Sequence, residues 1–208
     1  MFYTCSVRGG KMKALEELKK HLKPGQVYRR SGLTQWSNAV DRHLKQLVEE
    51  KTLQKLSQGL YYYPVKASFG NVPPEDEKLV CAFLKSSEFL LNSPNLYNSL
   101  GVGTTQLYNK KVVYNHKRHG LFMLGGKVFD FRLKHKFPKD LSREFLFVDL
   151  LNNLNELAEE REDVLRKVKE KVLEEPEAQM KRAVNAYAGE RAKTLFFQWM
   201  SEESLAHV

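Results

Sequence analysis

The sequence predicts an α+β fold: a small N-terminal domain of helices and one β-hairpin, then a second, mixed α/β domain with antiparallel strands and C-terminal helices. Apolar residues recur at helical spacing near both ends of the chain, whereas they alternate with polar residues over 107–133. The chain has 208 residues, 42% of them hydrophobic, which is enough apolar material for packed cores. We expect domains over 1–66 and 75–208, joined by a linker over 67–74.

The first domain begins with a predicted helix over 11–22. Leu15 and Leu18 fall on its apolar face, and lysines and glutamates occupy the other face. Pro24-Gly25 ends this helix, and a short segment over 27–33 leads to the next one.

A longer helix is predicted over 34–50. Apolar residues recur in it at i, i+4, i+7 and i+8 from Val40. Thr34 or Ser37 can serve as its N-cap, because a hydroxyl oxygen accepts a hydrogen bond from a free backbone N–H.

Two β-rich runs, 52–56 and 60–63, flank a glycine and predict a hairpin. The region over 1–66 therefore has the order helix, short helix, longer helix and hairpin. This order is typical of a winged helix-turn-helix.

The second domain is predicted to contain strands between helices. The helix over 75–91 opens with three acidic residues, which the helix dipole favours in a first turn. Alternation over 107–133, interrupted by glycines, predicts three or four antiparallel strands. Helical periodicity returns over 142–174, and a last helix is predicted over 177–200.

Charge is distributed in blocks along the chain. Residues 1–66 and 106–143 each have a net charge of +8, whereas 67–105 has −2 and 144–208 has −5, so that the whole chain has +9. Two strongly positive blocks raise the local concentration of an anionic partner, either a nucleic acid or an acidic protein surface.

The start of the helix over 34–50 carries side chains suited to base edges. In a helix-turn-helix the N-terminal residues of the second helix enter the major groove. Asn and Gln bond bidentately to adenine and Arg to guanine, whereas basic side chains on flanking segments suit phosphate. The candidate DNA-binding residues are Arg29, Arg30, Thr34, Gln35, Ser37, Asn38, Arg42, Lys45, Lys55, Ser57 and Gln58.

Asp41 would repel phosphate, so we expect it to pair with Arg42 or Lys45, or to accept from a cytosine amine. The alternative to a DNA-binding domain is a structural or protein-binding winged helix whose basic face is only solvated.

The sequence contains none of the common catalytic motifs. G-x-S-x-G, the Walker A loop, H-E-x-x-H and G-x-G-x-x-G are all absent. His116 and His119 have no further metal ligands near them in the sequence. Asp130 and Lys134 match part of a nuclease pattern, but Arg132 stands where a second acidic ligand is needed. We therefore expect no enzymatic activity, no cofactor and no metal site.

The segment over 27–64 has a hydroxyl-rich helix start, a leucine pair, a basic first wing strand and a glycine that leads into tyrosines. These features are carried by Thr34, Ser37, Leu44, Leu47, Lys55, Leu56, Gly59 and Tyr61–Tyr63. The segment resembles the N-terminal winged helix of AbiEi-type antitoxins from bacterial type IV toxin–antitoxin systems, and the continuation of the chain is similar in pattern. The resemblance implies a repressor that binds its own promoter and whose C-terminal domain counteracts a nucleotidyltransferase-like toxin. A stable complex with the toxin is not required in that family.

The second positive block is a candidate surface for a partner or a nucleic acid. Its basic residues are Lys110, Lys111, Lys117, Arg118, Lys127, Arg132, Lys134 and Lys136. Four roles are open for these residues. They could extend the DNA footprint, face an acidic toxin surface, cover a nucleic acid that the toxin also binds, or simply form a solvated face of the sheet. The alternative function is a stand-alone winged-helix transcriptional regulator whose second domain senses a ligand or dimerises, and the oligomeric state is left open.

The chain carries no sign of a membrane or secretory protein. No apolar stretch approaches the roughly 20 residues that span a bilayer, and the start lacks the apolar segment of a signal peptide. Cys5 and Cys81 lie far apart and form no CxxC pair. We expect a cytoplasmic protein with no membrane partner, and we expect double-stranded DNA as a partner. The resemblance implies that this DNA is the protein's own promoter and that a cognate toxin is a further partner.

Overall fold

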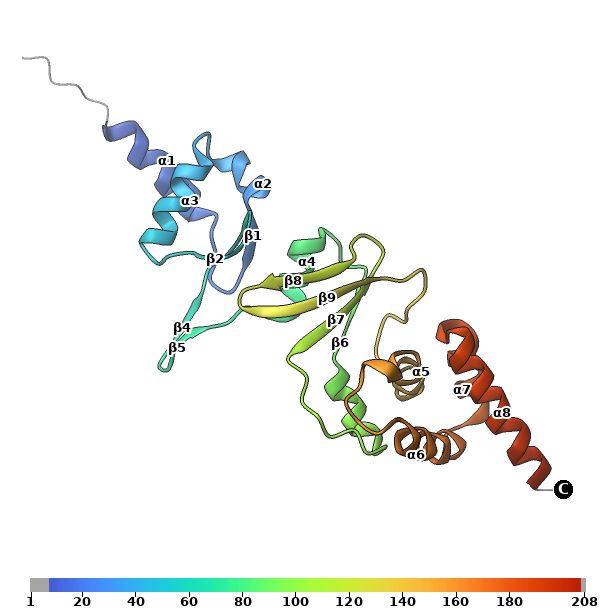
Figure 1. The fold of residues 1–208 in the computed structure, drawn as a ribbon. Coiled ribbons are helices and arrows are strands. Elements are labelled where there is room, and N and C mark those ends of the chain that lie inside the picture. The colour runs from blue at the N-terminus through green and yellow to red at the C-terminus, as the bar shows by residue number, and fades with distance from the viewer. Residues whose placement is uncertain (1–7, 207–208) are drawn as a thin grey trace, which may run out of the picture. The chain divides into compact units, whose positions relative to one another are not determined.

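The computed structural model describes residues 8–206, with side chains described from Ala14 to Glu202 (Figure 1). The chain divides into two compact units. Unit 1 contains the residues before Glu88 together with 123–127, and unit 2 contains 88–122 and the residues from Val128 onward. Both units contain helices and strands, so the predicted α+β class is confirmed, with antiparallel strand pairs and C-terminal helices.

Unit 1 starts with helices and a three-stranded antiparallel sheet in the order β1-β3-β2. Its first elements are α1 (Arg8–Lys20), β1 (Val27–Arg29), α2 (Arg30–Leu33), the 3-10 turn η1 (Thr34–Trp36), α3 (Val40–Glu49), β2 (Gln54–Ser57) and β3 (Leu60–Tyr62). The pairing of β2 with β3 confirms the predicted hairpin. Leu18, Leu44 and Leu47 belong to one buried cluster, as the helical spacing of the leucines predicts.

Helix α3 begins later than predicted. Residues 34–36 form a 3-10 turn, and Ser37 is extended, with φ −155° and ψ 121°. The N-cap of α3 is Ala39, which has no side-chain capping hydrogen bond. The prediction that Thr34 or Ser37 caps this helix is therefore wrong.

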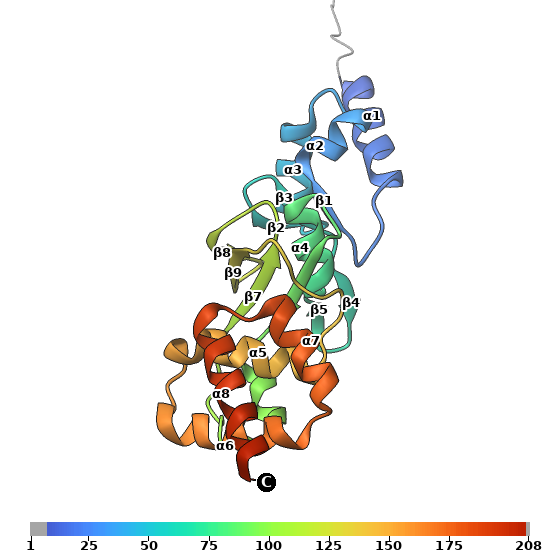
Figure 2. The same ribbon diagram turned by 90° about the vertical axis from the view of Figure 1, so that its right-hand side faces the viewer.

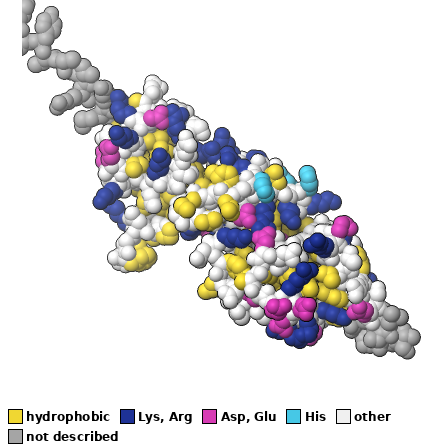
Figure 3. Space-filling model, viewed as in Figure 1, with side chains coloured by type: hydrophobic (Ala, Val, Ile, Leu, Met, Phe, Trp, Pro, Cys, Tyr) yellow, Lys and Arg dark blue, Asp and Glu magenta, His cyan; other side chains and the backbone are white. Residues whose placement is uncertain are grey.

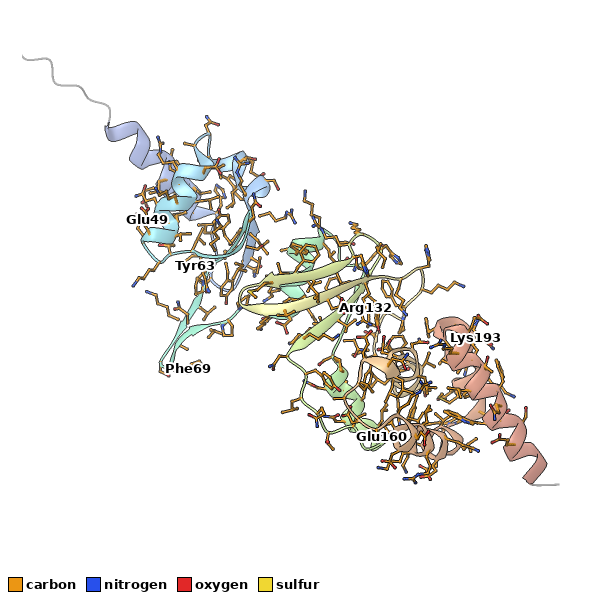
Figure 4. The ribbon with its side chains drawn as sticks, in the orientation of Figure 1. Glu49, Tyr63, Phe69, Arg132, Glu160 and Lys193 are labelled. Atoms are coloured by element: carbon orange, nitrogen blue, oxygen red, sulfur yellow. The ribbon has the colours of Figure 1, made fainter. Side chains whose placement is uncertain are left out.

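The predicted linker over 67–74 contains most of a second hairpin, β4 (Val65–Ala67) and β5 (Gly70–Val72). The Tyr62 hydroxyl donates to the Val72 carbonyl at 3.0 Å and so connects this hairpin to the end of β3. The tip residue Phe69 is exposed (Figure 4).

Helix α4 (Asp76–Leu84) is shorter than the helix predicted over 75–91. It ends at a left-handed Lys85, with φ 55°, and residues 89–92 form a strand instead. The helix belongs to unit 1, so the boundary between the compact units lies after Ser87, whereas the sequence places a linker over 67–74.

A four-stranded sheet has the order β6-β7-β9-β8. Its strands are β6 (Phe89–Asn92), β7 (Lys110–Asn115), β8 (Gly120–Leu124) and β9 (Lys127–Leu133). β6 and β7 are antiparallel, but β7 and β9 are parallel, so the prediction of antiparallel strands throughout 107–133 is wrong. The reason is that β8 occupies the edge of the sheet and returns the chain through Gly125-Gly126, two glycines with positive φ, so that β9 lies beside β7.

Unit 2 also contains the 3-10 segments η2 (Pro94–Leu100) and η3 (Leu154–Glu156), and helices α5 (Arg143–Asn153), α6 (Arg161–Glu174), α7 (Glu177–Tyr187) and α8 (Glu190–Ala206). The helical periodicity over 142–174 and 177–200 is confirmed, but each run is divided into two helices. Helix α5 lies among the other three (Figure 2), and seven consecutive residues of it, 145–151, are buried.

Over residues 8–206, no helix is long and apolar enough to cross a membrane. Cys81 is an exposed free thiol, and Cys5 lies outside the described residues.

Candidate functional site

The candidate site is the N-terminal end of α3. Val40, Leu44 and Leu47 face the core of unit 1, so the helix presents its opposite, polar face to solvent. Arg42 and Lys45 are exposed on that face. Beside them is a shallow groove of about 360 Å³, which is lined by Arg30, Thr34, Ser37, Asn38, Ala39, Val40, Asp41 and Arg42.

A buried hydrogen bond fixes the turn that precedes α3. The hydroxyl of Ser37 lies 2.8 Å from Nδ1 of His43, and it accepts a hydrogen bond from the backbone N–H of Ala39 at 3.2 Å. Ser37 and His43 are only 6% and 2% exposed. Ser37 therefore holds the start of α3 in place, and its hydroxyl is not presented to a ligand as the sequence predicted.

Burial of His43 should make the stability of unit 1 sensitive to acid. Burial lowers the pKa of His43 below 6.5, and the nearby charge of Arg42 lowers this pKa further. Below about pH 6.5 the unfolded chain therefore binds more protons than the folded one at this residue, so stability should fall with falling pH. We expect His43→Gln to flatten the pH dependence of the melting temperature of unit 1 between pH 7.5 and 5. An unchanged slope in this variant would contradict this account of His43.

Asp41 is paired with Arg30, whereas the sequence predicted a pairing with Arg42 or Lys45. The guanidinium Nε and Nη2 of Arg30 each donate to one carboxylate oxygen of Asp41 at 2.6 Å. The pair holds the pKa of the Asp41 carboxyl below its usual value. Arg30 is also fixed through its backbone, because its N–H donates to the carbonyl of Gly59 in the β2–β3 turn at 2.9 Å.

Arg29, the other predicted phosphate ligand before the turn, has a structural role. Its Nη1 donates to the carbonyls of Ala82 and Phe83 at 2.6 and 2.8 Å. These carbonyls lie in the last turn of α4, where backbone acceptors have no partner within the helix. Arg29 thus joins α4 to β1, and its guanidinium is engaged by the protein rather than presented to phosphate.

The remaining predicted DNA-binding residues differ in the exposure and in the hydrogen bonding of their side chains. The Thr34 hydroxyl donates to the Ser31 carbonyl at 2.8 Å, and the Gln35 amide donates to the Gly32 carbonyl at 2.7 Å. Both side chains are exposed but folded back on α2, on a turn that precedes α3 rather than on α3 itself. Asn38 next to α3, and Lys55 and Gln58 on the hairpin, are exposed, and Ser57 is half-buried.

Comparison with known proteins gives no relative for this chain: no family model matches it, and neither curated proteins nor solved structures provide a match.

The second positive block contains three cations that carboxylates neutralise. Lys110 lies 2.9 Å from Glu156, and Lys127 lies 2.7 Å from Asp76. Arg132 (Figure 4) bridges Asp130 and Glu156 at 2.7 and 2.6 Å. These pairs leave little net charge at the three positions. Lys111 is half-buried on β7.

The other predicted cations of this block lie on two loops that contact one another. The side chain of Asn115 accepts from the backbone N–H groups of Lys117 and Arg118 at 2.8 and 2.7 Å and orders the loop after β7. The loop after β9 carries Lys134 and Lys136, and the N–H of Lys134 donates to the Asn115 carbonyl at 3.1 Å. In Figure 3, histidine side chains lie among Lys and Arg side chains on the visible face. The structure therefore reduces the predicted surface to two basic loops of unit 2.

A buried carboxylate in α5 is a feature that the sequence analysis missed. Asp149 is 1% exposed, and its oxygens accept from the Asn92 amide at 2.6 Å and from the hydroxyls of Tyr97 and Tyr114 at 2.7 and 2.6 Å. The Asn153 amide joins the same network, because it donates to the Asp149 carbonyl at 2.8 Å. The signal in the sequence is a lone carboxylate within the apolar run FLFVDLL.

Proposed function

We propose that the protein binds double-stranded DNA through a winged helix-turn-helix in unit 1, with the N-terminal end of α3 in the major groove. The observation that carries this proposal is the exposed polar end of α3, whose groove is joined through Arg30 to the β2–β3 turn. The element order α1-β1-α2-α3-β2-β3 and the strand order β1-β3-β2 support it.

The exposed residues divide into two kinds of contact. Asn38, Arg42 and Lys45 lie at the start and on the polar face of α3, where side chains of a groove helix reach base edges. Lys55 and Gln58 lie on the hairpin and suit the phosphate backbone, which sets register without reading sequence.

We further propose that this DNA is the protein's own promoter and that the protein is an antitoxin of the AbiEi type, which counteracts a nucleotidyltransferase-like toxin. The resemblance over 27–64 supports this role, as do the two basic loops of unit 2, which suit an acidic protein surface or a nucleic acid.

Two assays of the full chain test these proposals. A reporter gene driven by the protein's own upstream region should be repressed when the protein is expressed. In a second assay, cells that express a nucleotidyltransferase-like toxin encoded beside the gene should recover growth when the protein is co-expressed. Repression without rescue would remove the antitoxin role and keep the DNA-binding role.

A specific observation favours the alternative function of a regulator with a ligand-sensing domain. Unit 2 contains a cavity of about 290 Å³, lined by residues of α5, η3 and the starts of α6 and α8. Its lining includes the buried Leu151 and Leu154, the half-buried Leu195, and three exposed charged residues, Arg161, Glu190 and Arg191. A small molecule with an acidic group suits such a lining.

A further inference from the structure

We propose that Arg30 reads a guanine in the major groove and that Asp41 is the positioning residue that holds its guanidinium for this contact. This inference rests on the proposed DNA-binding function and deepens it, because it assigns a base-reading role to a residue that the sequence suggested for phosphate.

The Asp41 carboxylate occupies one edge of the Arg30 guanidinium and leaves the adjacent edge open. Asp41 takes the edge formed by Nε and Nη2, with both distances at 2.6 Å. The adjacent edge, formed by Nη1 and the second hydrogen of Nη2, has no protein acceptor among the described residues. That edge presents two parallel N–H donors, which match the N7 and O6 acceptors of guanine.

The fold holds both partners of this ion pair in place. Arg30 is the first residue of α2, and its backbone N–H is bonded to Gly59 in the hairpin turn. Asp41 lies in the first turn of α3. The guanidinium therefore loses little further side-chain entropy when it meets a base, and this preorganisation favours a directional contact over a loose phosphate contact.

The ion pair is accessible to a ligand. The side chains of Arg30 and Asp41 are 46% and 70% exposed, and both line the groove at the start of α3. An ion pair this exposed contributes little to folding stability. A carboxylate near DNA phosphates also opposes binding, so its presence is best explained by what it does to the orientation of Arg30.

The pairing also removes the other role suggested for Asp41. Both carboxylate oxygens accept from Arg30, so acceptance of a cytosine amine requires breaking one of these hydrogen bonds. Guanine recognition by Arg30 leaves the pair intact and adds two hydrogen bonds at its open edge.

The test uses the full chain and fluorescently labelled duplexes selected by the wild-type protein from a random-sequence pool. Each G·C pair of the selected site is replaced by A·T in turn, and affinity is measured by anisotropy. At one G·C pair the wild-type protein should lose about 5- to 150-fold in affinity. Arg30→Lys should lose this discrimination because an ammonium has no planar fork, and Asp41→Asn should reduce it to less than about threefold.

The sign of the Asp41→Asn effect on other duplexes separates the two roles of the carboxylate. Loss of the Asp41 carboxylate should leave the affinity for a random-sequence duplex unchanged or raise it, because a charge that repels phosphate is removed. The preference for guanine should fall at the same time. Glu17→Gln is the matched control, since Glu17 is an exposed carboxylate that pairs with Lys20 on α1, outside the groove, and it should change neither quantity.

Three results would overturn the inference or its basis. Tighter binding of Asp41→Asn to every duplex with guanine preference intact would make Asp41 a mere repulsive charge. Retained preference in Arg30→Lys would show that Arg30 does not read the base. Absence of duplex binding by the wild-type protein would instead remove the proposed function itself.

Discussion

Asp149→Ala should lower the free energy of unfolding of unit 2 by about 3–5 kcal/mol. The substitution removes the acceptor of three buried donors, those of Asn92, Tyr97 and Tyr114, all within 2.7 Å of the carboxylate. Each donor is then left unsatisfied in the core, where hydration cannot replace the lost bond. Urea denaturation followed by Trp199 fluorescence measures the change, in a Trp36→Phe background so that the signal comes from unit 2.

Asp149→Asn tests the same network through its pH dependence. Burial raises the pKa of Asp149 above 3.8, although the hydroxyls of Tyr114 and Tyr97 favour the charged form. A carboxyl with a raised folded pKa contributes stability that is complete below about pH 3.8 and is lost as pH rises through the folded pKa. The asparagine variant should lack this decline of stability with rising pH.

For the alanine variant, a loss of less than about 1 kcal/mol in the free energy of unfolding on Asp149→Ala would contradict the structural role of the network.

Arg42→Ala should weaken binding to the cognate duplex by about 1–3 kcal/mol and relax its sequence preference. Arg42 is exposed on the polar face of α3, so its loss should remove the proposed base contact without disturbing the core. Lys55→Ala on the hairpin should instead weaken all duplexes similarly and reduce the salt slope by about 1. Fluorescence anisotropy at several salt concentrations distinguishes these two outcomes.

Lys171→Ala is the matched control for both variants. Lys171 lies on α6 of unit 2 and pairs with Glu174 at 2.8 Å. The Lys171→Ala substitution removes one positive charge from the same chain, and it should leave the affinity for the duplex and the salt slope nearly unchanged. Equal effects of Arg42→Ala and Lys171→Ala would mean that net charge alone, and not the face of α3, governs binding.

The local spacing of apolar residues predicted which helices and strands unit 1 contains better than it predicted the residues at which they begin and end. The spacing of Val40, Leu44 and Leu47 correctly predicted the buried face of α3. The predicted start of α3 at residue 34 was wrong, because the helix begins at Val40, about 1.7 turns later. Side-chain contacts that periodicity does not reveal accompany this later start: Trp36 stacks on His21, with 4.5 Å between ring centroids, and Ser37 is hydrogen-bonded to His43.

The order of the strands in the sheet and the partners of the charged side chains could not be predicted from the sequence either, because both depend on contacts that local patterns do not reveal. The alternation over 107–133 predicts strands, but it does not say that β8 lies at the edge and β9 beside β7. Charge counts likewise treat Arg132 as a free cation, whereas Glu156 from η3 neutralises it. Of the predicted site, the exposed side chains of α3 could be read from periodicity, but the pairing of Arg30 with Asp41 could not.

The most direct test of the central claim is duplex binding by the full chain across salt concentrations, with its own upstream region compared with a random-sequence duplex. We predict tighter binding to the upstream duplex, with log K falling linearly with log salt as phosphate contacts release counterions. Failure to bind any duplex at low salt, or equal affinity for both duplexes at every salt concentration, would contradict the account.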